Sequence, residues 1–189
     1  MKFNLKLHQC CDHDFLRPAM NHIIFKNNKI VASDGHILIA VDMDDLPFRG
    51  KEKEILEGKS IHHKGFSKIW NKDVKITEEG LMCESEHILV PWSKEDFTYP
   101  KWEKIIPDLN KVKPIKSIGI SSKLLNILAH CFPCDPYHRG LFELYITDVT
   151  NAVVVFNKPA ELKTFAIIMP IMQTENFNPV LNKKTMRFI

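Results

Sequence analysis

Short apolar runs separated by turn residues recur along the chain, and this pattern predicts a protein built mainly of β-strands. Residues 22–26 and 29–32 are two such runs, joined by the pair Asn27-Asn28. Because asparagine tolerates positive φ, the pair suits the two-residue turn of a β-hairpin. Residues 37–43 form a further apolar run, so a third strand is expected beside the hairpin.

Two further units of this kind follow at spacings of roughly fifty to sixty residues, which favours a repeat architecture. The second unit opens at residues 59–63 and continues with a predicted helix at residues 64–71, where Phe66, Ile69 and Trp70 fall at helical spacing. Its strands are expected at residues 73–77, 81–84 and 87–91.

The third unit contains a second predicted helix at residues 123–131. Leu124, Leu125 and Leu128 repeat there at helical spacing, and Ser121 is the expected N-cap. Its strands are expected at residues 141–147, 152–156 and 162–168.

These units predict an α+β fold of repeated helix-plus-strand units with antiparallel sheets. Residues 1–107 are expected to form a domain of two units, and residues 108–172 a half-domain of one unit. Residues 173–189 have weak periodicity and are expected to form a C-terminal tail.

The composition predicts a cytoplasmic protein and excludes one that spans a membrane. Hydrophobic residues make up 44% of the 189, yet no apolar run approaches the ~20 residues that a membrane-spanning helix needs. The first residues lack the apolar segment of a secretory signal, so a cytoplasmic location is the expectation. Five cysteines, an odd number, fit free thiols in a reducing compartment better than a disulfide framework.

The formal net charge is only +3, but basic residues are concentrated in two stretches. Residues 49–75 hold eight Lys or Arg against four Asp or Glu, and residues 101–123 hold six against two. Such a local excess can create a positive face for the phosphates of a nucleic acid. A solvated lysine surface without a partner explains the same pattern equally well.

Three short motifs stand in order along the chain. Ser33-Asp34-Gly35-His36-Ile37-Leu38 lies between two predicted strands, where an Asp-Gly pair is first of all a turn signal. Tyr99-Pro100-Lys101-Trp102 opens a segment that ends at Ile106-Pro107, and Ile168-Met169-Pro170-Ile171 closes the third unit. Together they resemble the Thr-Asp-Gly-His-Arg-Leu, Phe-Pro-Asp-aromatic and Val-Met-Pro-Met motifs of the beta sliding clamps of bacterial replicative DNA polymerases.

The resemblance covers about residues 14–172 and implies a truncated, divergent clamp. The matching part corresponds to the middle domain of the family and the second half of its last domain, so the predicted fold is the DNA-clamp fold. In the family these motifs form a hydrophobic pocket that binds short peptides of polymerases, clamp loaders and repair proteins. Carried over residue by residue, the implied pocket consists of Met20, Ser33, Gly35, His36, Ile37, Leu38, Pro100, Lys104, Ile105, Ile167, Met169, Pro170 and Ile171.

Apolar walls of Met and Ile with a few polar rim groups suit a peptide groove. Two positions depart from the family pattern. Ile37 stands where the family has arginine, and Gln173 stands where it has a basic residue. The preferred peptide is therefore expected to differ from that of the family.

The resemblance also implies helices that meet the phosphate backbone of double-stranded DNA without reading sequence. If residues 64–71 are helical, lysines four residues apart share one face, and further lysines precede and begin the second helix. The expected DNA-binding residues are Lys64, Lys68, Lys72, Lys111, Lys113, Lys116 and Lys123.

Two other chemistries compete with this interpretation. Cys131 and Cys134, with His138 nearby, could bind zinc together with partners from residues 8–13, although no second Cys-x-x-Cys exists. The pair His62-His63, and Asp34 with His36, invite an enzyme hypothesis. The chain, however, has no nucleophile motif, phosphate loop or spaced carboxylate cluster. No metal, cofactor or catalytic residue is therefore predicted.

The leading hypothesis is a non-enzymatic, DNA-tethering processivity factor that recruits DNA polymerase or other clamp-binding peptides and works as a homo-oligomer. The alternative is an adaptor or competitor that keeps the peptide pocket without encircling DNA. A closed ring requires several copies, because an unpaired half-domain must find a partner across a subunit interface.

Overall fold

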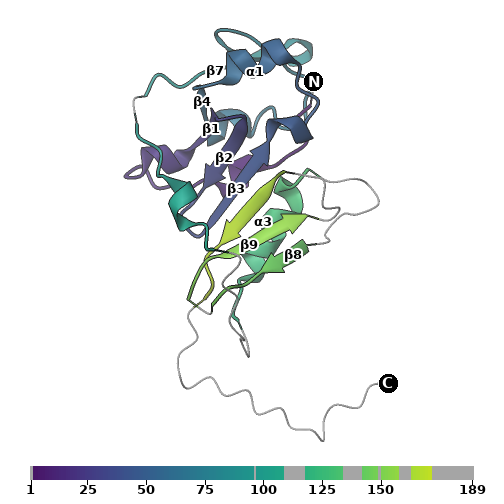
Figure 1. Ribbon diagram of the computed structural model, residues 1–189. Helices are drawn as coiled ribbons and strands as arrows, with labels where there is room; N and C mark the ends of the chain where they lie inside the picture. The colour runs from purple at the N-terminus through teal and green to yellow at the C-terminus, as the bar shows by residue number, and fades with distance from the viewer. Residues whose placement is uncertain are drawn as a thin grey trace, which may run out of the picture.

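The computed structural model describes residues 2–95, 97–108, 118–133, 142–148, 150–157 and 163–171. Within them the chain forms a seven-stranded antiparallel sheet and a separate three-stranded sheet (Figure 1). In spatial order, the strands of the large sheet are β4 (Ser60–His62), β1 (His22–Lys26), β2 (Lys29–Ser33), β3 (Ile37–Asp42), β10 (Phe165–Ile168), β9 (Val153–Asn157) and β8 (Phe142–Tyr145).

The β1–β2 hairpin confirms the turn predicted at the asparagine pair. Lys26 pairs with Lys29, and the two residues between them have φ of 54° and 59°. Positive φ at both central positions is the geometry that matches the twist of antiparallel strands, and asparagine reaches it at low cost.

The large sheet joins the first and third predicted units through one strand pair. Ile37 in β3 lies opposite Ile168 in β10, and Leu38 lies opposite Ile167. Strands that are over a hundred positions apart in the sequence thus become neighbours, and the two segments share one sheet.

Strand β3 is buried on both faces, and its side chains alternate between two apolar clusters. Ile37, Ile39 and Val41 belong to the main core, whereas Leu38 and Ala40 belong to a smaller cluster on the opposite face. Two covered faces explain why the sequence of this strand is apolar throughout instead of alternating.

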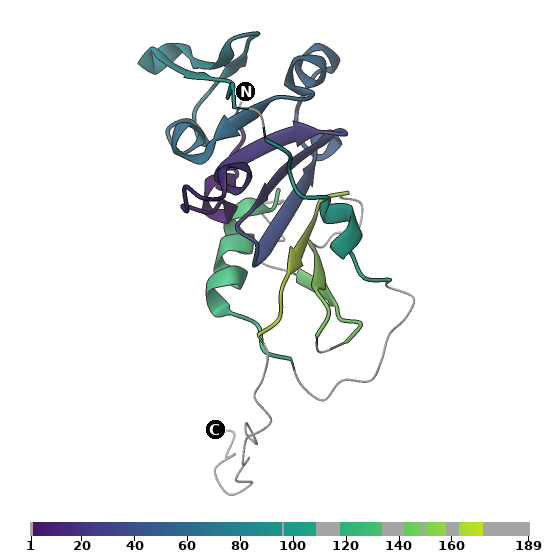
Figure 2. The ribbon, with the colours of Figure 1, turned by 90° about the vertical axis from the view of Figure 1, so that its left-hand side faces the viewer.

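Helices cover one face of the large sheet. The short helix η1 (Leu7–Cys10) contacts β2 and β3, and both α2 (His63–Phe66) and α3 (Ser122–Cys131) pack against η1. On the other face lies η5 (Trp102–Ile105), so the strands separate α3 from η5 (Figure 2). The smaller apolar cluster lies beneath η5 and includes Phe97, Tyr99 and Trp102.

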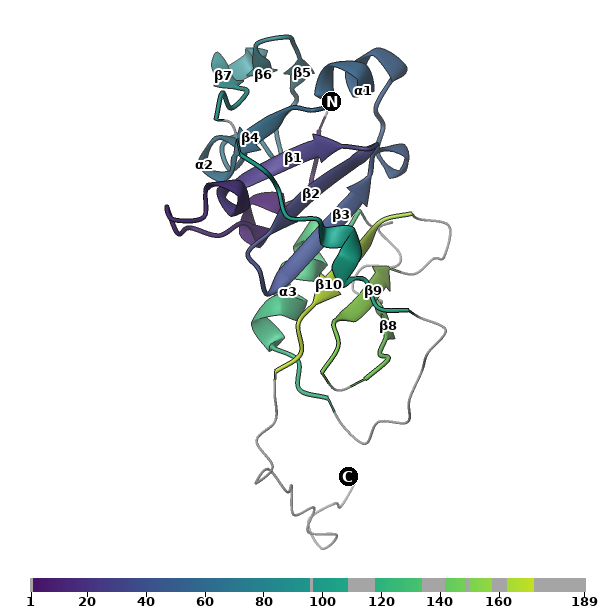
Figure 3. The same ribbon diagram turned by 60° about the vertical axis from the view of Figure 1, so that its left-hand side comes forward.

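The small sheet consists of β5 (Lys75–Ile76), β6 (Gly80–Cys83) and β7 (Ile88–Pro91) in that order. It lies with α1 (Gly50–Leu56) beyond the β4 edge of the large sheet (Figure 3). The remaining short helices are η2 (Pro18–Asn21), η3 (Met43–Asp45) and η4 (Glu84–Glu86). None of the helices in the described part of the chain is long and apolar enough to cross a membrane.

The helix predicted at residues 64–71 is shorter than expected, because α2 ends at Phe66 and is followed by turns. Gly65 explains the poor helix propensity of the segment. A β-carbon at this position would lie 2.4 Å from Cγ1 of Val90, so the approach of β7 favours glycine here. At the second helix, Ser121 is the N-cap by position, but its side chain makes no capping hydrogen bond. The predicted tail lies outside the described residues.

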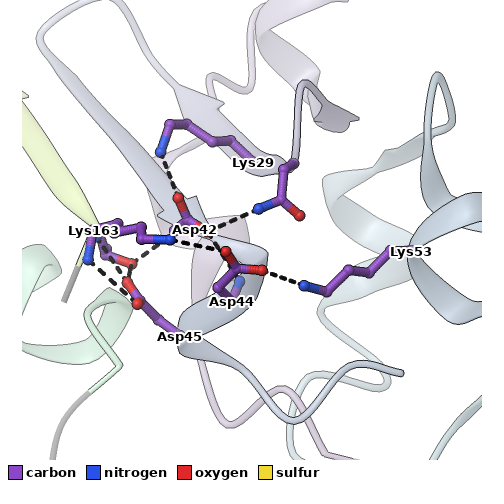
Figure 4. Close-up of polar contacts among 8 residues, drawn as sticks. Lys29, Asp42, Asp44, Asp45, Lys53 and Lys163 are labelled. Atoms are coloured by element: carbon purple, nitrogen blue, oxygen red, sulfur yellow. Dashed lines mark hydrogen bonds and ion pairs between the residues drawn. The ribbon is translucent and has the colours of Figure 1, made fainter. Parts of the chain in front are cut away.

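A polar network ties the end of β3 to the segment that enters β10 (Figure 4). Thr164 is buried; its hydroxyl group donates to Oδ2 of Asp45 at 2.6 Å and accepts the backbone N–H of Asp42 at 3.0 Å. Around this centre, Lys29 pairs with Asp42, and Lys163 pairs with Asp44. The network therefore fastens the third unit to the first at one end of the β3–β10 pair.

Candidate functional site

The Ser33–His36 motif forms the tight turn between β2 and β3. Oδ1 of Asp34 accepts the backbone N–H groups of His36 and Ile37 at 2.8 and 2.9 Å, and the hydroxyl of Ser33 donates to the carbonyl of Ile37. Gly35 has φ of 89°, which side-chain-bearing residues rarely adopt. Ser33, Asp34 and Gly35 thus shape the turn, and the exposed side chain of His36 is left at its surface.

The turn lies beside the end of β10. The backbone N–H of Met169 donates to the carbonyl of His36 at 2.9 Å, which extends the β3–β10 pairing beyond the strands. Leu38 and Ile167 lie opposite each other at this end and belong to the smaller apolar cluster. The first and third sequence motifs are therefore in direct contact.

The second motif covers this junction. The rings of Trp102 and Phe165 lie 5.6 Å apart, which holds η5 on the sheet. Ile105, at the end of η5, keeps 49% of its surface exposed. The three motifs converge as the clamp resemblance implied.

A cavity of about 160 Å³ lies where the three motifs meet. Ten of the thirteen predicted pocket residues line it: Met20, Ser33, Gly35, His36, Ile37, Leu38, Pro100, Ile105, Ile167 and Met169. Tyr99, Lys101 and Trp102 complete its wall. The walls are mainly apolar, and the exposed His36 and Lys101 supply polar groups at the rim.

Three predicted residues do not line this cavity. Lys104 and Ile105 line a second cavity of about 360 Å³ next to the first, on the side of Thr147 and Ala152. Ile171 is exposed and pairs with Gly119 in an isolated bridge, and Pro170 precedes it. Because Ile105 belongs to both cavities, the two are adjacent.

Tyr99, Lys101 and Trp102 belong to the second motif, but they are not among the residues that the clamp resemblance placed in the pocket. Tyr99 is of special interest, because its buried hydroxyl has no hydrogen-bond partner among the described residues. Burial raises the pKa of this phenol well above its ordinary value. The signal in the sequence that could have identified Tyr99 is its position as an aromatic residue next to the motif proline, Pro100.

The single helix face predicted for Lys64, Lys68 and Lys72 does not form, because α2 ends at Phe66. Lys64 lies in α2 and is exposed, Lys68 is exposed in the turns that follow, and Lys123 is exposed in the first turn of α3. Lys72 forms an ion pair with Glu86, so its charge is already compensated. Lys111, Lys113 and Lys116 lie outside the described residues.

The cysteines bear on the zinc alternative. The Sγ atoms of Cys10 and Cys131 lie 3.4 Å apart in the core. Burial raises the pKa of Cys11 well above its ordinary value, which disfavours the thiolate that zinc requires. No group of three or more potential ligands is arranged for a metal in the part of the chain that the structure describes. Cys134 and His138 lie outside that part.

Four histidines form a continuous row of ring contacts that the sequence did not reveal. His13 lies 4.4 Å from His63, His63 lies 4.6 Å from His62, and His62 lies 5.0 Å from His22. Loss of hydration, reinforced by His13 and His62, lowers the pKa of His63 to about 4. Desolvation and His22 also lower the pKa of His62. This row lies at the contact between β1, β4 and α2 and the loop before η2.

No family model and no curated protein sequence matches this chain. Its fold is nevertheless similar to solved bacterial sliding clamps. The DNA polymerase III beta-subunit clamp of Bartonella birtlesii, bound to griselimycin, superposes with a TM-score of 0.54 at 14% identity, over 89% of this chain and 63% of that one. For the beta subunit of Thermotoga maritima the TM-score is 0.54 at 11% identity, covering 89% and 63%. For the Bacillus subtilis clamp it is 0.52 at 11%, covering 89% and 62%.

These matches confirm the predicted α+β clamp fold. This chain spans less than two thirds of the length of the clamps that it matches, in agreement with the partial resemblance found in the sequence.

Proposed function

We propose that this chain is a clamp-like DNA-tethering factor that captures peptide segments of partner proteins in the cavity between β3, β10 and η5. The observation that carries the proposal is the convergence of three separate sequence motifs on one cavity with apolar walls. A concave, mostly apolar site with a few polar groups is what a peptide anchor residue requires.

The chemistry of the cavity supports capture of a peptide without bond chemistry. The carboxylate of Asp34 accepts two backbone N–H groups of its own turn, so it is engaged in shaping the site. Met20 and Met169 provide adaptable apolar contacts. Replacement of the family arginine by Ile37 makes the wall less polar, so this cavity is expected to favour peptides with more apolar character.

Replacing Ile105 by lysine is expected to weaken binding of griselimycin, the compound bound to the Bartonella clamp, at least tenfold. The substitution places a charge on the cavity wall and removes apolar contact area, and tenfold corresponds to about 1.4 kcal/mol. Isothermal titration calorimetry measures the change. Leu89→Lys is the matched control, because Leu89 on β7 is similarly exposed but does not line the cavity. If the two variants bind griselimycin with equal affinity, the cavity is not the binding site and this part of the proposal is wrong.

The tethering part of the proposal rests on Lys64, Lys68 and Lys123. Changing Lys64 and Lys68 together to glutamate is expected to lower affinity for a short DNA duplex and to reduce the slope of log affinity against log salt by about 2. Fluorescence anisotropy at several salt concentrations measures both quantities. The control, Lys26→Glu with Lys94→Glu, changes net charge equally at two other exposed lysines. If both double variants lose affinity alike, the assignment to these lysines fails.

The adaptor alternative makes a different prediction in the same experiments. An adaptor binds griselimycin normally but has no salt-dependent affinity for duplex DNA. That combination of results would favour an adaptor that captures peptides over a factor that also tethers them to DNA.

A further inference from the structure

The hydroxyl group of Tyr99 lacks the hydrogen bond that buried hydroxyl groups normally make. Tyr99 lines the cavity between β3, β10 and η5, and its hydroxyl oxygen is closed off from solvent without a partner among the described residues. Two other buried side-chain atoms in this part of the chain are unpaired, on His8 and Asn21, but neither residue lines the cavity. An unpaired buried donor destabilises a folded protein, so this group points to a role that the ligand-free protein does not show.

The other polar side chains of the cavity wall have partners or reach water. The hydroxyl of Ser33 donates to the carbonyl of Ile37 at 2.8 Å and accepts the backbone N–H of Gly35 at 3.1 Å. The exposed polar side chains at the rim are those of His36 and Lys101. Among the described residues that line the cavity, Tyr99 therefore carries the one buried polar atom with unused hydrogen-bonding capacity.

The hydroxyl group of Tyr99 keeps its proton and is available as a donor. Loss of hydration raises the pKa of Tyr99 well above its ordinary value. Negative charge on Cys11, Cys10 or Asp34 would raise this pKa further. The same surroundings disfavour a negatively charged ligand group at this depth, so the partner that fits best is a neutral hydrogen-bond acceptor.

Packing of the fold does not require this hydroxyl group. The ring of Tyr99, like those of Phe97 and Trp102, packs against the smaller apolar cluster. Phenylalanine would make the same ring contacts, and the clamp motif that Tyr99-Pro100-Lys101-Trp102 resembles has phenylalanine at this position. The oxygen atom is thus an addition in this chain that its own packing leaves unused.

The cavity of the ligand-free protein must enlarge to hold a peptide anchor. Its volume is about 160 Å³, whereas sites for small ligands usually measure roughly 300–1,000 Å³. Met20 and Met169 form part of its wall, and unbranched methionine side chains change rotamer easily. Met169 is also exposed, so its movement displaces few packed neighbours.

We propose that the hydroxyl group of Tyr99 donates a hydrogen bond to a backbone carbonyl oxygen of the captured peptide once the methionine side chains of the wall have moved aside. The hydroxyl is unpaired in the free protein and paired in the complex, so binding removes the cost of the unpaired group. A segment that presents a carboxylate or a second donor at this point is disfavoured. The inference rests on the proposed function and adds a specificity-determining contact to the same site.

Tyr99→Phe is expected to change stability and binding in opposite directions. Removal of the unpaired hydroxyl raises the melting temperature by about 2–4 °C, and loss of the hydrogen bond weakens griselimycin binding about three- to tenfold. Differential scanning calorimetry and isothermal titration calorimetry of the full chain measure the two effects. Tyr145→Phe is the matched control, because Tyr145 on β8 is exposed and does not line the cavity, and it should change neither quantity.

Tyrosine ring NMR gives a signature that a purely structural role would not produce. The chain has three tyrosines, so the Cζ carbon signal that disappears in Tyr99→Phe belongs to Tyr99. Because Cζ is bonded to the hydroxyl oxygen, its chemical shift responds to a new hydrogen bond. Griselimycin is expected to move the Tyr99 signal and to leave that of Tyr145 in place.

The outcomes separate failure of this inference from failure of the proposed function. If griselimycin binds wild type and Tyr99→Phe equally, or leaves the Tyr99 signal unmoved, the inference is wrong while peptide capture stands. If Tyr99→Phe is less stable than wild type, the hydroxyl is already paired and the inference is again wrong. A wild type that does not bind griselimycin contradicts the proposed function, and the inference with it.

Discussion

Replacing Thr164 by valine is expected to lower the free energy of unfolding by about 2–3 kcal/mol. Valine has nearly the same shape, but it can neither donate to Asp45 nor accept the N–H of Asp42. The side chain of Thr164 is 1% exposed, so water cannot replace these hydrogen bonds. Leaving buried donors and acceptors unpaired costs about 1–3 kcal/mol each. Chemical denaturation monitored by circular dichroism measures the loss.

The matched control is Lys163→Met at the adjacent position. Lys163 pairs with Asp44, but its side chain is 64% exposed, and exposed ion pairs contribute at most about 1 kcal/mol. Its removal is therefore expected to change stability little. If Lys163→Met costs as much as Thr164→Val, the exposed ion pairs and not the buried hydroxyl hold the third unit to the first.

Acidification from pH 7 to pH 4 is expected to lower the free energy of unfolding by about 2–3 kcal/mol through His63 in the histidine row. In the folded protein the pKa of His63 is lowered to about 4, whereas its unperturbed value is 6.5. The unfolded chain therefore binds more protons between these two values. Its contribution to stability is complete above pH 6.5 and is lost as the pH falls towards 4.

The surroundings of His63 explain the direction of this effect. His63 is buried, and a proton on it would face His13 from the loop, His62 from β4, Lys64 from α2 and His8 from η1. All of these are basic groups. Around His62, the basic His22 and Lys64 oppose protonation more strongly than the acidic Glu95 favours it.

Thermal unfolding between pH 7.5 and pH 4 measures the predicted loss. The control is His63→Phe, which keeps a ring of similar size but cannot be protonated, and its stability is expected to vary less across this range. Asp44, whose pKa is lowered by Lys53 and Lys163, loses its contribution only below about pH 4. A wild type and a His63→Phe variant with parallel pH profiles would exclude the row as the cause.

The local sequence was sufficient to predict those parts of the structure that depend only on neighbouring residues. The asparagine pair predicted the β1–β2 hairpin, because positive φ is a property of the residue itself. The leucine spacing predicted α3, and the structure begins that helix one residue earlier, at Ser122. The Asp-Gly turn before β3 was recognisable for the same reason.

Predictions from the sequence were wrong or incomplete where segments that are far apart in the chain pack together. The helix expected at residues 64–71 ends at Phe66, and the packing of Val90 against Gly65 contributes to this early end. Lysine spacing could not reveal that Lys72 pairs with Glu86 from η4. The histidine row draws on β1, β4, α2 and a loop, so no single stretch of sequence contains its pattern.

The cavity between β3, β10 and η5 shows what the local sequence and the tertiary packing each contribute. The three motifs are visible in the sequence, and their resemblance to the clamps identified ten of the cavity-lining residues. The pairing of β3 with β10, and the closure of the wall by Tyr99, Lys101 and Trp102, became evident only from the packing of the folded chain. The physical reason is that turns and strands follow from local backbone preference, whereas burial and exposure depend on which distant segments pack together.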